Sequence, residues 1–138
     1  MYEYAAVIRR VIDGDSIVVD VDMGRGIWVL KARHRLVGCN ARALAIPGGV
    51  QARANLLKLI PEGTQVTLRS FKPYKYGGSD EAAEYMCDIT AGPFLPPGVG
   101  VGSLVTHLIA THWAAPWDGH GPAPQPPWPR PEEGGPLI

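Results

Sequence analysis

The feature that most constrains the fold is a regular alternation of side chains from Ser16 to Met23. The residues on its apolar face are Ile17, Val19, Val21 and Met23. A period of two is typical of a half-buried strand, so this segment predicts one. A Gly-Arg-Gly turn at 24–26 then returns the chain into a long strand at 27–39. A strand of that length usually bends or spans two sheets, as happens in a small barrel.

The remaining segments supply the other elements of a small domain. Further strands are expected at 3–12, 64–71 and 83–90, with a long polar loop between the last two. Helices are expected at 50–60 and from the capping residue Ser103 to about His112. The apolar positions at helical spacing are Val50, Ala54 and Leu57 in the first helix and Leu104, Val105 and Leu108 in the second.

Three strands, a helix, two strands and a helix is the element order of a five-stranded OB-type barrel. The expected fold class is therefore mainly β with two helices (α+β). A mixed α+β sheet fits the pattern nearly as well. The strand at 64–71 would place Val66 and Leu68 inward, and the strand at 83–90 would place Tyr85, Cys87 and Ile89 on one side.

Charge and cysteine content narrow the functional classes. The 138-residue chain has 13 basic and 13 acidic side chains, so binding to a polyanion would have to be local. Cys39 and Cys87 lack clustered Cys/His spacing, which predicts buried free thiols rather than a zinc site, with a disulfide as the minority alternative. The chain lacks a signal-peptide pattern at its start and a run of about 18 apolar residues, so we expect it to remain in the cytoplasm without membrane contact.

The last part of the chain has a different composition from the rest. Eight of the 14 prolines fall in residues 114–138, together with Trp117 and Trp128 and almost no aliphatic residue before Leu137 and Ile138. Such a segment cannot build a core and should be extended and polyproline-like. We infer a domain at 1–113 and a docking tail at 114–138. The tail would be held, by its own domain or by a protein partner, through those four apolar side chains.

A candidate site lies in the stretch from Arg33 to Gly49. Arg35 stands at the end of the long strand, and Asn40 belongs to the Gly-Cys-Asn turn that follows it. Asp15 lies in a second acidic turn upstream, Asp13-Gly14-Asp15-Ser16. A guanidinium, an amide and a carboxylate at neighbouring turns are suited to hold a phosphate together with a cation.

Four motifs in order resemble the thermonuclease (staphylococcal-nuclease-like) family over residues 5 to about 113. They are VIDGDSIVVDVD at 11–22, RLVGCNA at 35–41, PEGTQVTL at 61–68 and KYGG at 75–78. With Pro47-Gly48-Gly49 and the Pro-rich ending, the chain looks in particular like short nuclease-like proteins of actinobacterial phages. The resemblance implies an OB barrel with a calcium-dependent phosphodiesterase site.

The resemblance assigns expected roles to individual residues. Asp15 and Asn40 would bind the cation, although the neutral Asn40 weakens such a site. Arg35 would stabilise charge on the phosphoryl oxygens, and Lys75 and Tyr76 would contact phosphate. From the residues alone, Arg35 is equally a solvated strand arginine or a structural group that bridges to Asp15. The absence of the family's general base, at the position of Ala43, favours the structural role.

Two catalytic groups of the family are absent. The position of the general base is Ala43, which has no proton acceptor, and loss of a positioned base typically costs about 10²- to 10⁴-fold in rate. The second arginine is replaced by the sequence Gly77-Gly78-Ser79-Asp80. The residues that could in principle substitute are Glu81 or Glu84 as a base and Arg42 or Arg53 as a cation. We do not expect such rescue, because the geometry of the reacting groups tolerates little displacement.

Two functions follow as hypotheses. The first is a non-catalytic, nuclease-like binding or assembly module that needs no cofactor and engages a partner through its tail. The phage likeness would make it a decoration or connector component of a virion, bound to other virion proteins. The alternative is a weakened calcium-dependent nuclease or a single-stranded nucleic-acid binder that retains Ca²⁺ at Asp15 and Asn40.

Overall fold

The computed structural model describes the backbone of residues 2–76 and 84–135 and the side chains of residues 3–71 and 85–135. The elements, in chain order, are β1 (Tyr2–Val11), β2 (Ser16–Asp22), β3 (Trp28–Leu36), β4 (Cys39–Ala41), α1 (Gly49–Leu59), β5 (Gln65–Tyr76), β6 (Glu84–Ala91), α2 (Leu104–Ala110), β7 (Ala114–Pro116) and the 3-10 helix η1 (Pro131–Glu133).

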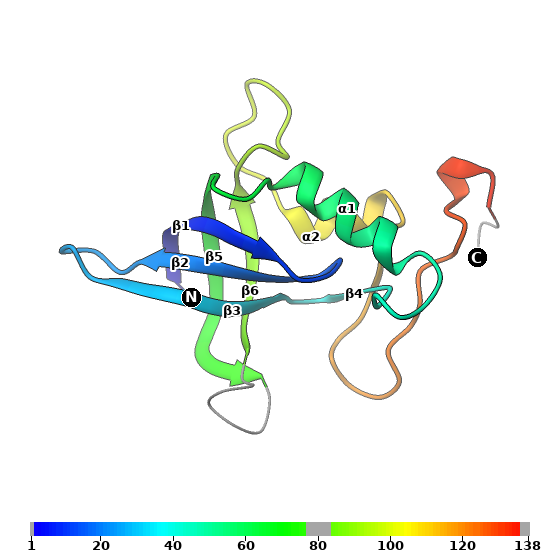
Figure 1. Cartoon of the computed structure of the whole chain (residues 1–138), viewed down its shortest axis with the longest axis horizontal. Coiled ribbons are helices and arrows are strands. Elements are labelled where there is room, and N and C mark those ends of the chain that lie inside the picture. The colour runs from blue at the N-terminus through cyan, green and yellow to red at the C-terminus, as the bar shows by residue number, and fades with distance from the viewer. Residues whose placement is uncertain (1, 77–83, 136–138) are drawn as a thin grey trace.

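Five strands close into a barrel in the order β1-β2-β3-β6-β5, with β5 paired back onto β1 (Figure 1). All of these pairings are antiparallel except β3 with β6, which is parallel. The two helices pack outside the strands. The predicted fold class, an OB-type α+β barrel, is therefore confirmed, and the open mixed sheet is excluded.

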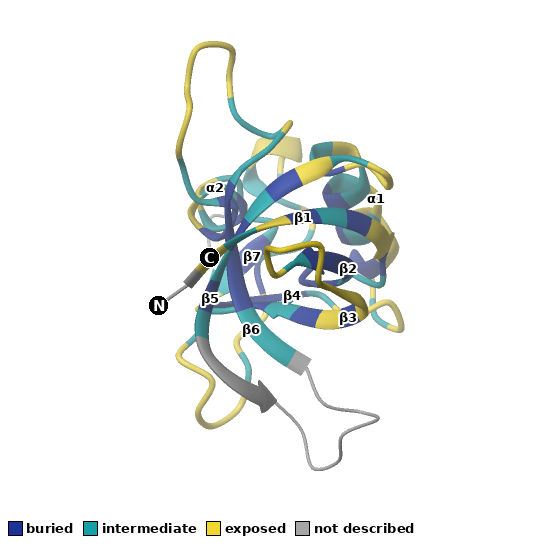
Figure 2. Cartoon of the chain, turned by 90° about the vertical axis from the view of Figure 1, so that its left-hand side faces the viewer, coloured by how far each residue is buried: buried dark blue, intermediate teal, exposed yellow. Residues whose placement is uncertain are grey.

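Alternation along the strands builds the core. Ile17, Val19 and Val21 of β2 are buried as predicted, and so are Val66 and Leu68 of β5. The predicted inward position of Met23 is wrong. Met23 is 44% exposed because it follows the end of β2, where the β2–β3 hairpin extends beyond the barrel (Figures 1 and 2).

Helix α1 buries a different face from the predicted one. Ala52 and Leu56 face the core, whereas Val50 and Ala54 are exposed. The reason is close packing against the turn that contains Gly14. A Cβ atom built on Gly14 would lie 2.9 Å from the Cβ of Ala52 and 2.7 Å from that of Ala41. Small side chains must therefore face this turn, and the larger Val50 turns outward.

Helix α2 agrees with its prediction on both capping and orientation. The Ser103 hydroxyl accepts a hydrogen bond from the backbone N–H of Thr106 at 3.1 Å, and Leu104, Val105 and Leu108 are buried. The Ser103 hydroxyl also donates to the Asp88 carboxylate of β6 at 2.5 Å, which fixes the helix against the barrel. The helix ends at Ala110, two residues before the predicted end.

Three features of the backbone were not predicted. Strand β5 continues to Tyr76, where the polar loop was expected to begin at residue 72. The Gly-Cys-Asn segment is a short strand, β4, and it pairs with β7 from the start of the predicted tail. The pairing of Asn40 with Ala115 matters most, because it brings the tail back to the candidate site.

Both cysteines are buried free thiols, which confirms that prediction. Burial raises the pKa of Cys39 to about 12, and burial also raises the pKa of Cys87. The thiols are therefore protonated and unreactive at neutral pH. Within the described residues, the helices lack the length and apolar character needed to cross a bilayer.

Candidate functional site

The acidic turn between β1 and β2 places Asp15 inside the protein. Asp15 is only 4% exposed. Its backbone N–H donates to the Asp13 carboxylate at 3.1 Å, which closes the turn. Its Oδ2 atom accepts a hydrogen bond from the backbone N–H of Ala41 at 3.0 Å, so the carboxylate joins this turn to β4.

Arg35 bridges the two other predicted site residues. Its Nη2 atom lies 3.3 Å from Oδ2 of Asp15 and 3.2 Å from Oδ1 of Asn40. The parallel pairing of β3 with β6 holds the Arg35 backbone opposite Met86. The structure therefore brings Asp15, Arg35 and Asn40 together, as the sequence predicted, and the bridge from Arg35 to Asp15 is present.

Burial has the largest effect on the pKa of Asp15. Loss of solvation raises its pKa from 3.8 to about 7, against the opposing effect of the Arg35 guanidinium. The neighbouring Asp13 carboxylate raises the pKa further, and the hydrogen bond from Ala41 lowers it. A substantial fraction of Asp15 is therefore protonated at neutral pH.

This arrangement is a poor match for calcium. Ca²⁺ takes about six to eight oxygen ligands, preferably charged ones. Here the oxygens of Asp15 and Asn40 that would face the ion are already bridged by a positively charged nitrogen of Arg35. Among the residues that the structure describes, no three His, Cys, Asp or Glu side chains are grouped to hold a metal. In this geometry Asp15 and Asn40 contact Arg35, and their binding of a cation stays a prediction.

The C-terminal segment covers the same residues. We call residues 117–135 the strap. The Nδ2 atom of Asn40 donates to the carbonyl of Pro124 at 2.9 Å. The guanidinium carbon of Arg35 lies 5.5 Å from the ring centroid of Trp117, and the backbone N–H of Trp117 donates to the carbonyl of Gly38 at 3.0 Å. The strap thus contacts two of the three site residues.

Little space is left under Trp117. The hollow between Arg35 and the Trp117 side chain has a volume of about 30 Å³. That volume equals the share of a single molecule in liquid water, which is roughly 30 Å³. A phosphodiester could approach the Arg35 guanidinium from this side only if the strap moved.

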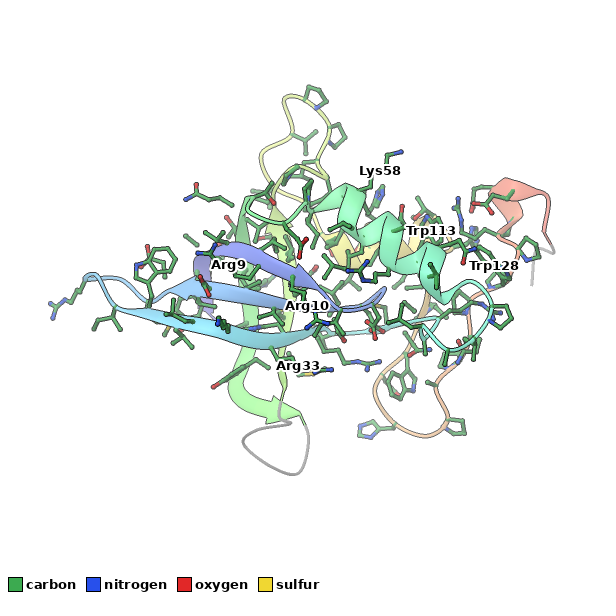
Figure 3. The ribbon with its side chains drawn as sticks, viewed as in Figure 1. Arg9, Arg10, Arg33, Lys58, Trp113 and Trp128 are labelled. Atoms are coloured by element: carbon green, nitrogen blue, oxygen red, sulfur yellow. The ribbon has the colours of Figure 1, made fainter. Side chains whose placement is uncertain are left out.

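The second half of the strap docks beside the start of α1. Arg42 donates through Nε to the carbonyl of Pro126 at 3.0 Å. Trp128 packs on Trp113 with 6.2 Å between ring centroids, and Figure 3 shows the two side by side. Gly48, at φ +89°, makes room for this ring, because a Cβ atom there would lie 2.6 Å from Cδ2 of Trp128.

Arg130 and the 3-10 helix close the strap onto the end of α2. The guanidinium carbon of Arg130 lies 4.0 Å from the ring centroid of Trp113, and Nη1 donates to the carbonyl of Thr111 at 2.7 Å. Arg130 also pairs with Glu132 and Glu133, both at 2.9 Å. His112 contacts Glu132, and this hydrogen bond lowers the pKa of Glu132. The strap is therefore held along its length by its own domain.

The other predicted site residues contribute less. Ala43 is exposed in the loop before α1, and its carbonyl accepts a hydrogen bond from the backbone of Ile46. Arg53, a candidate replacement cation, instead donates through Nε to the carbonyl of Val11 at 3.0 Å. Arg42, the other candidate, is committed to the strap. The predicted roles that lie outside the described side chains are those of Lys75, Tyr76, Ser79, Asp80, Glu81, Glu84, Leu137 and Ile138.

Sequence reasoning missed the residues that receive the strap. Neither Trp113, which receives the strap, nor Arg130, the strap residue whose guanidinium lies over it, was assigned a role from the sequence. A signal for one of them exists, since the consecutive glycines 48 and 49 suggest a close approach of another group. Comparison with known proteins adds no assignment, because no protein-family model and no curated protein matches this chain.

Proposed function

We propose that this chain is a non-catalytic, thermonuclease-like OB module that acts in binding and assembly, as a decoration or connector protein of a phage virion. The observation that carries the proposal is the use of the nuclease-like residues as a clamp. Asn40 holds the strap carbonyl of Pro124, and Arg35 is placed between Asp15, Asn40 and the Trp117 ring.

Catalysis would need groups that the described residues of this site do not offer. A phosphodiesterase requires an acceptor for the proton of the attacking water and preorganised positive charge for the phosphoryl oxygens. Ala43 has no acceptor, and the Asp15 carboxylate lies against Arg35 with its pKa raised to about 7. Each of these features lowers activity for a separate physical reason.

The clamp has a clear structural benefit instead. A Pro-rich segment with almost no aliphatic side chains cannot build a core of its own, so the barrel contacts are what hold it in place. Asn40 and Arg42 each supply a donor to a strap carbonyl, at 2.9 and 3.0 Å. The assembled surface of barrel and strap is what a virion partner would meet.

A nuclease assay tests the proposal. The full chain is incubated with Ca²⁺ and heat-denatured DNA, beside an Arg35→Ala variant and a deletion of residues 117–138 whose folding is checked by circular dichroism. We expect no cleavage that depends on Arg35, even after the strap is removed. Equal cleavage by the full chain and by Arg35→Ala would indicate a contaminating nuclease. Cleavage that Arg35→Ala abolishes would overturn the proposal.

One observation favours a second candidate, a calcium-dependent phosphodiesterase or single-strand binder. Oδ2 of Asp15 lies 3.3 Å and Oδ1 of Asn40 lies 3.2 Å from Nη2 of Arg35, so the three groups expected to bind a cation and a phosphate converge at one atom. Under this hypothesis the strap covers the site, and release of the strap exposes the site. Lys75 and Tyr76 would then contact the strand. Binding of a labelled oligothymidine that appears on strap deletion and weakens with salt would support this candidate.

A further inference from the structure

The strap is held by a pattern of contacts that suits proline. Asn40 donates to the carbonyl of Pro124 at 2.9 Å, and Arg42 donates to the carbonyl of Pro126 at 3.0 Å. Proline offers a carbonyl but no N–H group, so a surface that recognises proline donates to carbonyls and packs on rings. The two donors therefore match the chemistry of the segment they hold.

An aromatic anchor follows these two carbonyls. Trp128 packs on Trp113 with 6.2 Å between ring centroids, and the lack of a side chain at Gly48 leaves room for the Trp128 ring. Aromatic-lined grooves bind polyproline segments in recognition domains. We call the residues that hold these three strap positions the receiving surface: Asn40, Arg42, Gly48 and Trp113.

The outer part of the strap, residues 122–135, is held through few side chains. Within the described residues, no backbone-to-backbone hydrogen bond joins it to the rest of the protein, and Pro126 is its one buried residue. A segment held in this way can leave its surface without breaking a strand pairing. Undocking therefore leaves the barrel intact.

An exposed loop joins β7 to the outer part of the strap. It consists of residues 118–121, Asp-Gly-His-Gly, and both glycines have positive φ with no atom within 4 Å of an added Cβ. Among the described residues its hydrogen bonds are local, from Trp117 Nε1 to the carbonyl of His120 at 3.1 Å and from the His120 N–H to Asp118 at 2.8 Å. Figure 1 shows this loop in orange, outside the barrel. The loop has the properties of a hinge.

Opening of the hinge gives the strap enough reach to meet a second molecule. The seven residues 118–124 span roughly 25 Å when extended. In dilute solution the tether keeps the local concentration of the strap high, so the strap stays on its own domain. Where copies are crowded, as in an assembled virion, the receiving surface of a neighbour offers the same contacts.

We propose that two copies exchange the outer parts of their straps, so that residues 122–135 of each dock on the receiving surface of the other. The occupant is a second copy, because the strap fits this surface in the folded chain and exchange preserves each of those contacts. The exchange is reciprocal, so the assembly closes as a dimer. This inference rests on the proposed assembly role and gives it a contact between neighbouring modules.

Complementation between two variants tests the proposal. Asn40→Ala with Arg42→Ala damages the receiving surface and leaves the strap intact, whereas Trp128→Ala with Arg130→Ala does the reverse. At a concentration at which each variant alone is monomeric, an equimolar mixture should sediment as a dimer. Thermal melts establish that both variants are folded.

A matched control uses an exposed strap position between the two bonded carbonyls. Gln125→Ala, added to the Asn40→Ala, Arg42→Ala variant, should leave the dimer in the mixture unchanged.

Shortening the hinge gives an independent test. Deletion of residues 119–121 removes the slack that lets the strap turn back onto its own domain. This variant should be dimeric at concentrations at which the unmodified chain is monomeric, since short hinge loops favour exchange. Addition of Trp128→Ala should return it to a monomer.

Three results would overturn the proposal. They are a mixture of the two folded variants that stays monomeric, a folded hinge deletion that stays monomeric, and a hinge-deletion dimer that survives Trp128→Ala. If a labelled peptide of residues 122–135 binds the Trp128→Ala, Arg130→Ala variant while the mixture stays monomeric, the occupant is a Pro-rich segment of another protein. No DNA is involved, so these failures are distinct from failure of the proposed function, which is read from Arg35-dependent cleavage alone.

Discussion

Asp15 shows how burial can change the chemistry of a single residue. Its carboxylate accepts the backbone N–H of Ala41 and faces Arg35, and burial still raises its pKa to about 7. A buried ion pair is a weak source of stability, since desolvation offsets much of the Coulombic gain. The role that remains is to fix β4 beside the acidic turn.

The raised pKa of Asp15 predicts a specific dependence of stability on pH. The folded state binds the proton more tightly than the unfolded state, whose aspartate has a pKa near 3.8. The stabilisation is therefore complete below about pH 4 and is lost as pH rises through 7. Asp15→Asn should remove this dependence, which is on the order of 2–4 kcal/mol in the free energy of unfolding.

Urea denaturation at pH 5 and pH 8 measures this effect. The unmodified chain should lose more stability between the two values than Asp15→Asn does. Glu62→Gln, which removes an exposed carboxylate, is the control and should behave like the unmodified chain. An equal pH dependence in Asp15→Asn and the unmodified chain would show that Asp15 does not carry the proton.

Among the secondary-structure elements, the buried faces of the strands were more predictable from sequence than the details of strand pairing. Alternation placed Ile17, Val19 and Val66 correctly because a strand in a barrel has one buried face. Asp20 alternates with these residues and would therefore face outward, yet it is buried. A bulge opposite Asp20 lets its carboxylate accept the backbone N–H of Lys31 at 2.8 Å. Local periodicity carries no information on such bulges.

The helices also show that local spacing does not reveal tertiary contacts. Spacing alone predicted that Val50 would face the core, whereas Ala52 does, because close packing against Gly14 requires a small side chain. The pairing of β4 with β7 joins segments about 75 residues apart along the sequence, which short-range patterns cannot reveal. These non-local contacts are the ones that place the strap.

The contact between the strap and α1 yields a prediction at this scale. Gly48→Ala should displace Trp128, because the new Cβ atom would lie 2.6 Å from its ring, and should destabilise the protein by about 2–4 kcal/mol. Gly63→Ala is the matched control, since Gly63 also has φ +87° but no atom within 4 Å of the added Cβ. It should cost about 1–2 kcal/mol.

Chemical denaturation and tryptophan emission measure the two variants. Emission of Gly48→Ala should shift to longer wavelength as Trp128 enters water, and that of Gly63→Ala should not. If both variants lose equal stability and keep the same emission, the cost at Gly48 is one of backbone conformation alone and Trp128 does not dock there.

For the whole molecule, the sequence predicted the members of the site but not what they contact. The acidic turn, Arg35 and Asn40 fall together as expected because the turn leads into β2, Arg35 lies near the end of its neighbour β3, and Asn40 follows in β4. Their engagement by Pro124 and Trp117 depends on the path of a Pro-rich segment that has no periodicity of its own. Barrel and strap therefore act as one unit, whose two ends present different surfaces.

Hydrogen exchange at the backbone amide of Trp117 tests the central claim most directly, namely that the site residues clamp the strap. This N–H donates to the carbonyl of Gly38, so it should be protected in the unmodified chain. Asn40→Ala together with Arg42→Ala should lower its protection at least about tenfold, which corresponds to 1.4 kcal/mol, while core amides of β2 keep theirs. Exchange at the rate of an unfolded chain in the unmodified protein, or protection that the two changes leave intact, would contradict the account.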